Sequence, residues 1–256
     1  LGQTVAPAAV GFSPERLQKL DAAMAKVVAE GRVAGMTTYL ARHGKVVQFK
    51  TYGDQKLGGP AMSRDTIFRI YSMTKPVTGV AMMMLYEEGK WRLDDPVTKF
   101  VPEFRDLKVM NGVDAAGKPI LEPMKRPPTM RELMSHTGGF GYALSDSHPV
   151  DRMFRDQQVL RANGLQAMID KMKGIPLRSQ PGTEWYYSAS VDVQGYIVEK
   201  LSGRTLGQFF DERIFRPLKM KDTAFFVAPE KVGRLAAMYA GSTGKLVEST
   251  GPSPQD

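Results

Sequence analysis

The stretch from Tyr71 to Leu85 constrains the fold more than any other part of the chain. Apolar residues recur at helical spacing along Val77–Leu85, and Met82 and Met83 fill the opposite face, so the pattern predicts a helix that is apolar nearly all round. Such a helix is stable only when it is buried, so other elements must surround it. Pro76 belongs to its first turn, because a proline ring clashes with the carbonyl four residues earlier and has no amide hydrogen to donate.

A helix and a hairpin are predicted before this stretch. Ser13 is followed by a proline and a glutamate, which is typical of a helix start, and the apolar pattern then continues to Gly31. Met36–Arg42 and Val46–Tyr52 are two strand-like runs joined by a tight link that contains Gly44, which predicts a β-hairpin. Together these patterns predict a helix lying across an antiparallel sheet.

The rest of the chain differs in character. Helical signals dominate from Ser72 to about Leu218, and Thr223–Val227 returns to a strand pattern. We therefore expect residues 1–66 to form the N-terminal part of an α/β sheet domain, residues 67–221 a helical domain, and residues 222–256 an incomplete return to the sheet. The predicted fold class is α/β (α+β), an antiparallel sheet flanked by helices with a mostly helical insertion domain.

Composition narrows the classes of function. The net charge is +8, but no basic run is longer than a pair, so we interpret the charge as solubility and expect no nucleic-acid partner. The absence of cysteine excludes disulfides, thiolate metal sites and thiol catalysis. The most apolar stretch is far shorter than the about 20 residues that span a bilayer. The three histidines have no nearby acids at ligand spacing, so we expect no metal and no cofactor.

Ser72 and Lys75 lie one turn apart at the start of the predicted helix. A serine hydroxyl is a poor nucleophile until a base takes its proton, and a lysine is such a base when its pKa falls from about 10.4 toward 7. Burial and the positive end of a helix dipole both disfavour the ammonium form. The alternative is a serine cap beside a solvated lysine, but a polar pair at the mouth of an apolar helix favours chemistry.

A second candidate lies in Pro181–Ser190, where a proline–glycine turn leads through three aromatic residues into a helix that we expect Ser190 to cap. A phenol beside a lysine ammonium can lose its proton below its usual pKa of about 10 and act as a general base. This is the role that we consider for Tyr187. Core packing is the alternative, and it is the favoured interpretation for Trp185 and Tyr186.

These motifs together resemble the serine β-lactamase and penicillin-binding-protein superfamily, and within it the family VIII carboxylesterases related to class C β-lactamases. The resemblance implies Ser72 as the acylated nucleophile, Lys75 as its partner base and Tyr187 as the general base that later activates water. It also implies a small ester or lactam as the substrate. The stretches that carry the resemblance, in the order of the family, are Phe68–Lys75, Gly89–Val97, Arg131–Gly139, Pro181–Thr183 and Tyr187–Ala189.

Two features depart from the family pattern. Ala189 stands where class C β-lactamases have an asparagine that bonds the lactam amide, and an amide without its partner costs about 1–3 kcal/mol, which favours an ester substrate. The third motif of the family, a Lys-Thr-Gly or its equivalent on a sheet strand, is missing, because Gly241–Lys245 follows the Thr223–Val227 pattern too soon. Because the strand of this third motif is missing, we expect the chain to be one piece of a longer polypeptide, completed by a second fragment or a longer tail. Since the first residue is Leu1 rather than methionine, we also expect that an upstream segment was removed.

The first hypothesis is a serine carboxylesterase that hydrolyses small esters through an acyl-enzyme on Ser72, with allowance for weak β-lactamase activity. The alternatives are a β-lactamase or D-amino-acid peptidase on the same site, or a catalytically silent penicillin-binding-like scaffold. His136 is interpreted as structural, holding a turn, with His43 in a turn and His148 in a loop. The loop at Tyr142–Val150 is expected to influence acyl-chain preference. No substrate-binding residue, oligomeric state or compartment, cytoplasmic or periplasmic, is assigned.

Overall fold

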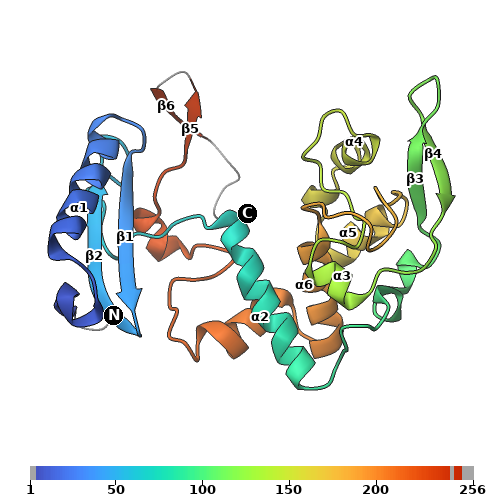
Figure 1. Ribbon diagram of the computed structural model, residues 1–256, viewed down its shortest axis with the longest axis horizontal. Coiled ribbons are helices and arrows are strands. Elements are labelled where there is room, and N and C mark those ends of the chain that lie inside the picture. Colours follow the sequence, from blue (N-terminus) through green and yellow to red (C-terminus); the bar gives the residue numbers. More distant parts are fainter. Residues whose placement is uncertain (1–3, 243–244, 250–256) are drawn as a thin grey trace. The chain divides into compact units, whose positions relative to one another are not determined.

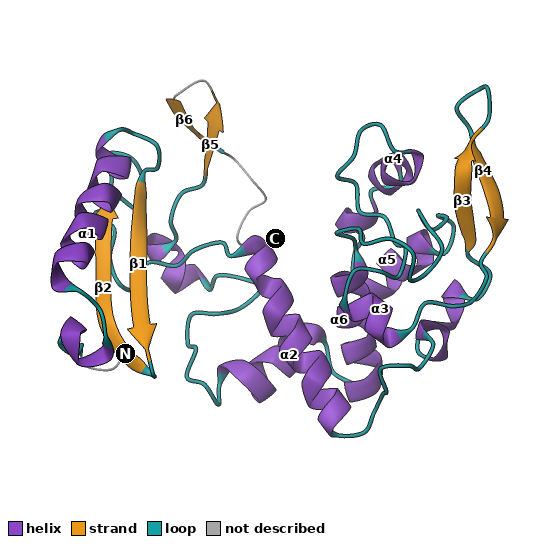
Figure 2. Ribbon diagram, viewed as in Figure 1, coloured by secondary structure: helices purple, strands orange, loops and turns teal. Residues whose placement is uncertain are grey.

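The computed structural model describes residues 4–242 and 245–249 (Figure 1). Contacts divide the chain into two units. The first unit combines the residues up to Ile70 with those from Ala224 onward, and the second unit is Tyr71–Thr223. Helices and short antiparallel strands occur in both (Figure 2), which confirms the predicted mixed class of antiparallel strands and helices.

The first unit begins with the predicted helix and hairpin. Ser13 caps the helix, since its side chain accepts a hydrogen bond from the Arg16 amide. The two strands pair antiparallel, with an irregular register between Leu40 and Ala41. The hairpin turn contains His43, whose φ of 51° lies in the left-handed region. In order, the elements are η1 (Pro7–Val10), α1 (Pro14–Ala29), β1 (Gly35–Arg42) and β2 (Lys45–Gly53).

The helix α1 packs on β2, as predicted (Figure 1). Asp21 on α1 holds the two together, because it accepts hydrogen bonds from the side chains of Gln48, Lys50 and Tyr52 on β2. The Gln48 amide lies 2.7 Å and the Tyr52 hydroxyl 2.9 Å from the carboxylate. One carboxylate therefore fixes the position of the helix across the hairpin.

The prediction of a strand at Thr223–Val227 is wrong. Residues 224–226 form a bend and residues 223 and 227 have no regular structure, and the side chains of Phe225 and Phe226 are 50% and 62% exposed. A strand needs a neighbour to satisfy its backbone groups, and a local pattern does not supply one. The chain continues through η7 (Pro229–Arg234) to the antiparallel pair β5 (Tyr239–Ser242) and β6 (Lys245–Glu248). Within Gly241–Lys245, residues 243 and 244 lie outside the described residues.

The second unit is mostly helical, as predicted. It also contains an antiparallel hairpin, β3–β4, that the sequence patterns did not predict. Its helices are α2 (Thr74–Glu87), α3 (Met130–Met134), α4 (Pro149–Asp156), α5 (Leu165–Met172), α6 (Ser190–Ser202) and α7 (Leu206–Phe210), followed by a π turn at Asp211–Phe215. Its strands are β3 (Lys108–Val113) and β4 (Pro119–Pro123), and its 3-10 turns are η2 (Tyr71–Met73), η3 (Val97–Lys99), η4 (Pro102–Phe104) and η5 (Val159–Arg161).

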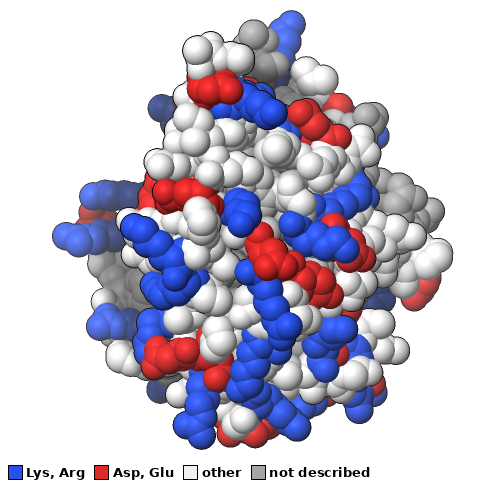
Figure 3. Space-filling model, turned by 90° about the vertical axis from the view of Figure 1, so that its right-hand side faces the viewer, with Lys and Arg blue, Asp and Glu red and all other residues white. Residues whose placement is uncertain are grey.

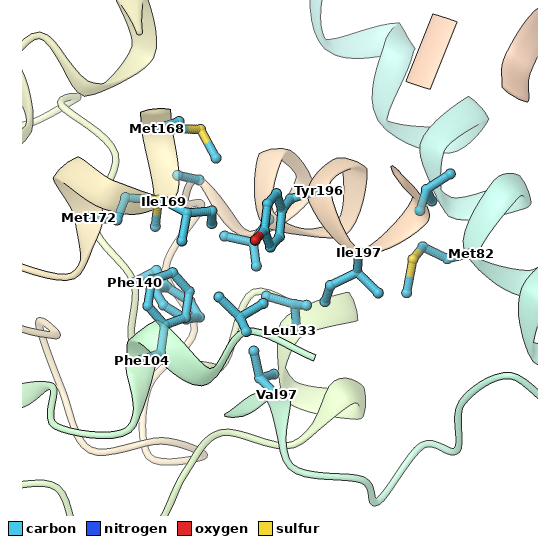
Figure 4. Close-up of a cluster of buried hydrophobic side chains, with 14 of the residues drawn as sticks. Met82, Val97, Phe104, Leu133, Phe140, Met168, Ile169, Met172, Tyr196 and Ile197 are labelled. Atoms are coloured by element: carbon cyan, nitrogen blue, oxygen red, sulfur yellow. The ribbon is translucent and has the colours of Figure 1, made fainter. Parts of the chain in front are cut away.

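The core of the second unit lies between α2, α3, α5 and α6 (Figure 4). The helix α6 is central to it, because it contacts all three of the others. The labelled side chains that converge there are Met82, Val97, Phe104, Leu133, Phe140, Met168, Ile169, Met172, Tyr196 and Ile197. Burial of these side chains is the main stabilising contribution to the unit and fixes the positions of the helices that carry the site.

The helix α2 was predicted to be buried nearly all round, but one of its faces is exposed. Ala81, Met82 and Leu85 are at most 1% exposed, as expected for core residues. Val80 and Met83, on another face of the helix, are 50% and 40% exposed. The helix packs on α6 and α7, which cover the first face and leave this second stripe open. Composition alone marked both faces as apolar, but packing buries only one.

Candidate active site

Ser72 lies in the 3-10 turn η2, which leads directly into α2. The residue that caps α2 is Met73, and Pro76 is the third residue of the helix, so Pro76 occupies the first turn as predicted. Tyr71 has a φ of 42°, an uncommon conformation for a residue other than glycine. Because the Ser72 side chain does not cap the helix, its exposed hydroxyl stays available for chemistry.

The three residues proposed from the sequence meet at one oxygen atom. The Lys75 ammonium donates a hydrogen bond to Ser72 Oγ at 3.2 Å. The Tyr187 hydroxyl donates to the same oxygen at 2.7 Å. Lys75 Nζ also lies 4.6 Å from the centre of the Tyr187 ring. All three side chains belong to the second unit, so the geometry of this cluster is set within one compact part of the chain.

The surroundings of Tyr187 favour loss of its proton. Burial pushes the pKa of the Tyr187 phenol up, but hydrogen bonds with Lys75 and Ser72 and the charge of Lys75 outweigh burial, so this pKa lies below its usual value. The lysine ammonium stabilises a phenolate beside it by charge attraction. A phenol in this setting is suited to accept a proton from a serine hydroxyl or from a water molecule.

Tyr142 is a second phenol at the site. From the sequence it was expected only as the first residue of a loop that influences acyl-chain preference, with no role beside Lys75. Its ring meets the Tyr187 ring edge to face at 5.7 Å, and the Lys75 ammonium lies 5.6 Å from its centre. Burial and the nearby charge of Asp192 raise the pKa of Tyr142. The pKa values of the two phenols beside Lys75 are therefore shifted in opposite directions, up for Tyr142 and down for Tyr187. The signal that could have found Tyr142 is its place three residues after Arg131–Gly139, one of the stretches that carry the family resemblance.

His136 packs against one face of the Tyr187 ring. Its Nδ1 accepts a hydrogen bond from the Ser188 amide at 3.1 Å, and its carbonyl accepts one from the Tyr186 amide at 2.9 Å. Its ring is stacked on that of Tyr187. Burial, together with the charge of Lys75, lowers the pKa of His136 and so favours the neutral ring. His136 holds its turn, as interpreted from the sequence, and it also contacts the Tyr187 ring directly.

The start of α6 differs from the expectation. Ser190 is the first residue of the helix and Ala189 is the cap residue, without a side-chain hydrogen bond. Ser190 is buried, and its Oγ lies 2.7 Å from Ser188 Oγ. Ala189 is fully buried, and its amide donates to the Gly141 carbonyl at 3.0 Å. No side-chain donor is therefore offered to a substrate from position 189.

The aromatic residues beside Tyr187 also differ from the expectation. Trp185 is 63% exposed, so it is not part of the core. Its ring and that of His136 meet in an edge arrangement, with ring centroids 6.3 Å apart. Tyr186 is half-buried and donates a hydrogen bond to Asp151. Burial and this bond raise the pKa of Tyr186 to about 12, which keeps it a donor. The Tyr186 hydroxyl is thus bound to Asp151, whereas the hydroxyl of the adjacent Tyr187 is bound to Ser72, which separates Tyr186 from the reactive cluster.

Within residues 4–242 and 245–249, no group of three or more His, Cys, Asp or Glu side chains is arranged to hold a metal ion. No helix in that part of the chain has the length and apolar character that a bilayer crossing requires. Lys and Arg are interspersed with Asp and Glu on the face shown in Figure 3. His148 caps α4, with its Nδ1 accepting the Val150 amide at 3.3 Å.

Comparison with known proteins places this geometry in context. A family model described as "Beta-lactamase" matches residues 20–256. Protein Rv1367c of Mycobacterium tuberculosis is 37% identical over 222 residues, which are 86% of this chain and 54% of that protein. Esterase EstB of Burkholderia gladioli is 34% identical over 219 residues, with 83% of this chain and 53% of EstB covered. The chain thus spans about half the length of these curated relatives.

A solved structure is similar over nearly the whole chain. It is described as "EstCE1, a hydrolase with promiscuous acyltransferase activity". The TM-score is 0.76 at 28% sequence identity, and the match covers 91% of this chain and 58% of that one.

Proposed function

This chain belongs to the beta-lactamase family, and from that premise we propose that it is a serine hydrolase that cleaves small carboxylic esters through an acyl-enzyme on Ser72. The observation that carries the proposal is the convergence of Lys75 and Tyr187 on Ser72 Oγ, at 3.2 Å and 2.7 Å. A nucleophile, a general base in contact with it and a cation that stabilises the deprotonated base form an arrangement suited to acyl transfer.

The first half-reaction forms the acyl-enzyme. With Tyr187 as a phenolate beside the Lys75 ammonium, the phenolate accepts the Ser72 proton as Oγ attacks the ester carbonyl carbon. The tetrahedral intermediate then collapses, the bond between the carbonyl carbon and the alkoxy oxygen breaks, and the alcohol leaves with the proton held by Tyr187. The acyl group remains as an ester on Ser72.

The second half-reaction returns the enzyme to its starting state. Tyr187 accepts a proton from a water molecule as the water oxygen attacks the acyl carbonyl carbon. The bond to Ser72 Oγ breaks, the serine regains the proton, and the carboxylic acid leaves. An alcohol in place of water gives acyl transfer. This second candidate is favoured by the similarity to EstCE1, which is described as a hydrolase with promiscuous acyltransferase activity.

An ester is favoured over a lactam for two reasons. Ala189 is fully buried and its side chain has no donor or acceptor for a lactam amide, whereas an ester has no amide group to satisfy. One curated relative, EstB, is named an esterase. The experiment must distinguish the esterase from two competing functions. One is a β-lactamase or D-amino-acid peptidase that uses the same residues, and the other is a catalytically silent scaffold.

The test compares wild type with Ser72→Ala on a short-chain nitrophenyl ester and on a chromogenic cephalosporin. Ser202→Ala is the matched control, because Ser202 lies at the far end of α6 in the same unit. We expect Ser72→Ala to lose nearly all ester turnover and Ser202→Ala to keep it. Substantial turnover by Ser72→Ala would end the proposal, and cephalosporin turnover comparable to that of esters would favour the β-lactamase alternative. Wild type that gains no fluorophosphonate adduct on Ser72 would identify a silent scaffold.

A further inference from the structure

The buried carboxylate of Asp151 is bound to the segments that carry Tyr142 and Tyr187, but it takes no part in the proposed reaction. Asp151 is in the first turn of α4 and is 0% exposed. It accepts hydrogen bonds from the Tyr142 amide at 3.2 Å and the Ser145 amide at 2.9 Å, and a third from the Tyr186 hydroxyl. A buried carboxylate is costly unless it is compensated, and here three donors compensate it.

An arginine completes the cluster. Arg178 Nη1 lies 3.5 Å from Asp151 Oδ1, and the guanidinium carbon lies 3.5 Å from the centre of the Tyr186 ring. The Arg178 side chain is only 11% exposed, and its amide donates to the Gly139 carbonyl at 2.7 Å. Burial pushes the pKa of Asp151 up, but its hydrogen bonds and the charge of Arg178 outweigh burial, and the pKa lies below its usual value. The cluster is therefore a buried ion pair with the Tyr186 phenol in contact with both of its members.

We propose that Asp151 and Tyr186 are positioning residues that set where the phenols of Tyr142 and Tyr187 lie, an inference that rests on the proposed function. Asp151 bonds directly to the backbone of Tyr142. Through Tyr186 it also holds the residue that precedes Tyr187 in the chain. One carboxylate thus joins two segments distant in the sequence, each of which carries one phenol of the site.

The consequence for chemistry follows from geometry. Proton transfer between Ser72 Oγ and the Tyr187 oxygen needs the two atoms within hydrogen-bond reach, and a displacement of about 1 Å at a catalytic group can cost about a hundredfold in rate. Release of Tyr186 from Asp151 would let the 186–187 backbone shift without removing any group that touches the substrate. A purely structural role for the cluster predicts a loss of stability alone.

The test compares Tyr186→Phe with Tyr196→Phe in the full chain. Both variants lose one hydrogen-bonded phenolic hydroxyl in the second unit, since the Tyr196 hydroxyl donates to Gln166 at 2.7 Å in the core. We expect similar decreases in Tm for the two. Only Tyr186→Phe should lower kcat for a nitrophenyl ester, by roughly three- to tenfold, with KM within about twofold of wild type. Its pH–rate profile should also shift, because the contact of Tyr187 with Lys75 changes.

Arg178→Lys provides a second variant that keeps the positive charge beside Asp151 but removes the planar contact with the Tyr186 ring. Arg178→Lys should show the same decrease in kcat and the same shift of the pH profile. If Tyr186→Phe does not fold, this second variant tests the positioning role instead. Tyr186→Phe with the kcat and pH profile of Tyr196→Phe, beside an active wild type, would overturn the positioning role alone. A wild type that neither turns over the ester nor takes up a fluorophosphonate would overturn the proposed function first.

Discussion

The imidazole of His136 lies almost parallel to the phenol ring of Tyr187, with ring centroids 5.0 Å apart and planes inclined by 23°. The backbone of His136 has a φ of 60°, in the left-handed region. Its ring is fixed by the hydrogen bond that Nδ1 accepts from the Ser188 amide. The candidate base is thus supported from one side by a ring that burial and Lys75 keep neutral. The geometry of the base therefore depends on a residue that does not contact Ser72 itself.

Replacement of His136 by asparagine separates the ring contact from the hydrogen bond. Asparagine tolerates a positive φ and offers an acceptor near the place of Nδ1, but it removes the stacked ring. Since such ring pairs contribute about 0.5–1.5 kcal/mol, we expect kcat for a nitrophenyl ester to fall by roughly two- to tenfold. His148→Asn is the control, because His148 also accepts a backbone amide at its Nδ1. Equal activities of the two variants would show that the stacking has no effect on the base.

The pH dependence of activity should report the environment of Tyr187. A general base works when it is deprotonated, so a pKa below the usual value moves the rising limb of the rate profile to lower pH. Lys75→Met removes the charge and the hydrogen bond that lower this pKa, and the limb should therefore move to higher pH. Lys90→Met, at an exposed lysine beyond the end of α2, should leave the profile unchanged. A Lys75→Met profile that rises at the wild-type pH would contradict this account of the base.

Removal of the Tyr187 hydroxyl should lower the rate of the chemical step rather than the affinity for the ester. We expect Tyr187→Phe to reduce kcat by about 10²- to 10⁴-fold, the usual contribution of a general base, while Ser72 stays in place. Tyr86→Phe is the control, since Tyr86 is 37% exposed on α2. Steady-state kinetics on the same ester measure both variants. Near wild-type kcat in Tyr187→Phe would assign the base to another group, for which Tyr142 is the neighbouring candidate.

Local signals in the sequence predicted the elements that carry the site, but not the contacts between distant segments. The cap at Ser13 and the proline at position 76 act over a few residues, and both are found where expected. The strand expected at Thr223–Val227 is absent because pairing depends on a partner that no local pattern names. The role of Tyr142 escaped notice for a similar reason, since its place beside Lys75 arises only when the loop after α3 folds over α2.

Asp151 illustrates the same limit for buried polar groups. Its sequence neighbourhood is that of an ordinary acid in the first turn of a helix, which is a favourable position for its charge. Its burial and its bond to Tyr186 become visible only in the folded chain. Trp185 shows the converse, because an aromatic run predicted core packing and the structure leaves this ring 63% exposed. Burial is a property of the whole fold, so residue type alone does not determine it.

The stability of the second unit should depend on pH through Glu132. Burial pushes the pKa of Glu132 up, but two hydrogen bonds from Arg126, at 2.5 and 2.8 Å, and one from the Thr129 amide outweigh burial, so this pKa lies below its usual value. The carboxylate therefore stabilises the fold fully above its unfolded pKa of about 4.3, and this stability is lost as the pH falls through the lower, folded pKa. Glu132 also closes the capping box at the start of α3.

Glu132→Gln should therefore destabilise the protein at pH 7 by about 1–3 kcal/mol and make Tm less dependent on pH in the acid range. Asp94→Asn is the control, since Asp94 also pairs with an arginine, at 3.2 Å, but is 81% exposed, and such pairs contribute little. Thermal unfolding between pH 3 and 7 measures both. An unchanged acid dependence in Glu132→Gln would show that this pair does not control acid stability.

Two adjacent methionines on α2 test which face of the helix is part of the core. Met82 is 0% exposed and its carbonyl accepts the Trp91 indole hydrogen at 2.8 Å, whereas Met83 is 40% exposed. Met82→Ala leaves a cavity among packed side chains and should cost about 2–5 kcal/mol, while Met83→Ala should cost less than about 1 kcal/mol. Chemical denaturation of the two variants measures the difference under identical helix propensities. Because the substitution is the same and the positions are neighbours, equal losses would mean that the exposed stripe of α2 is covered in solution and that this face, too, contributes to the core.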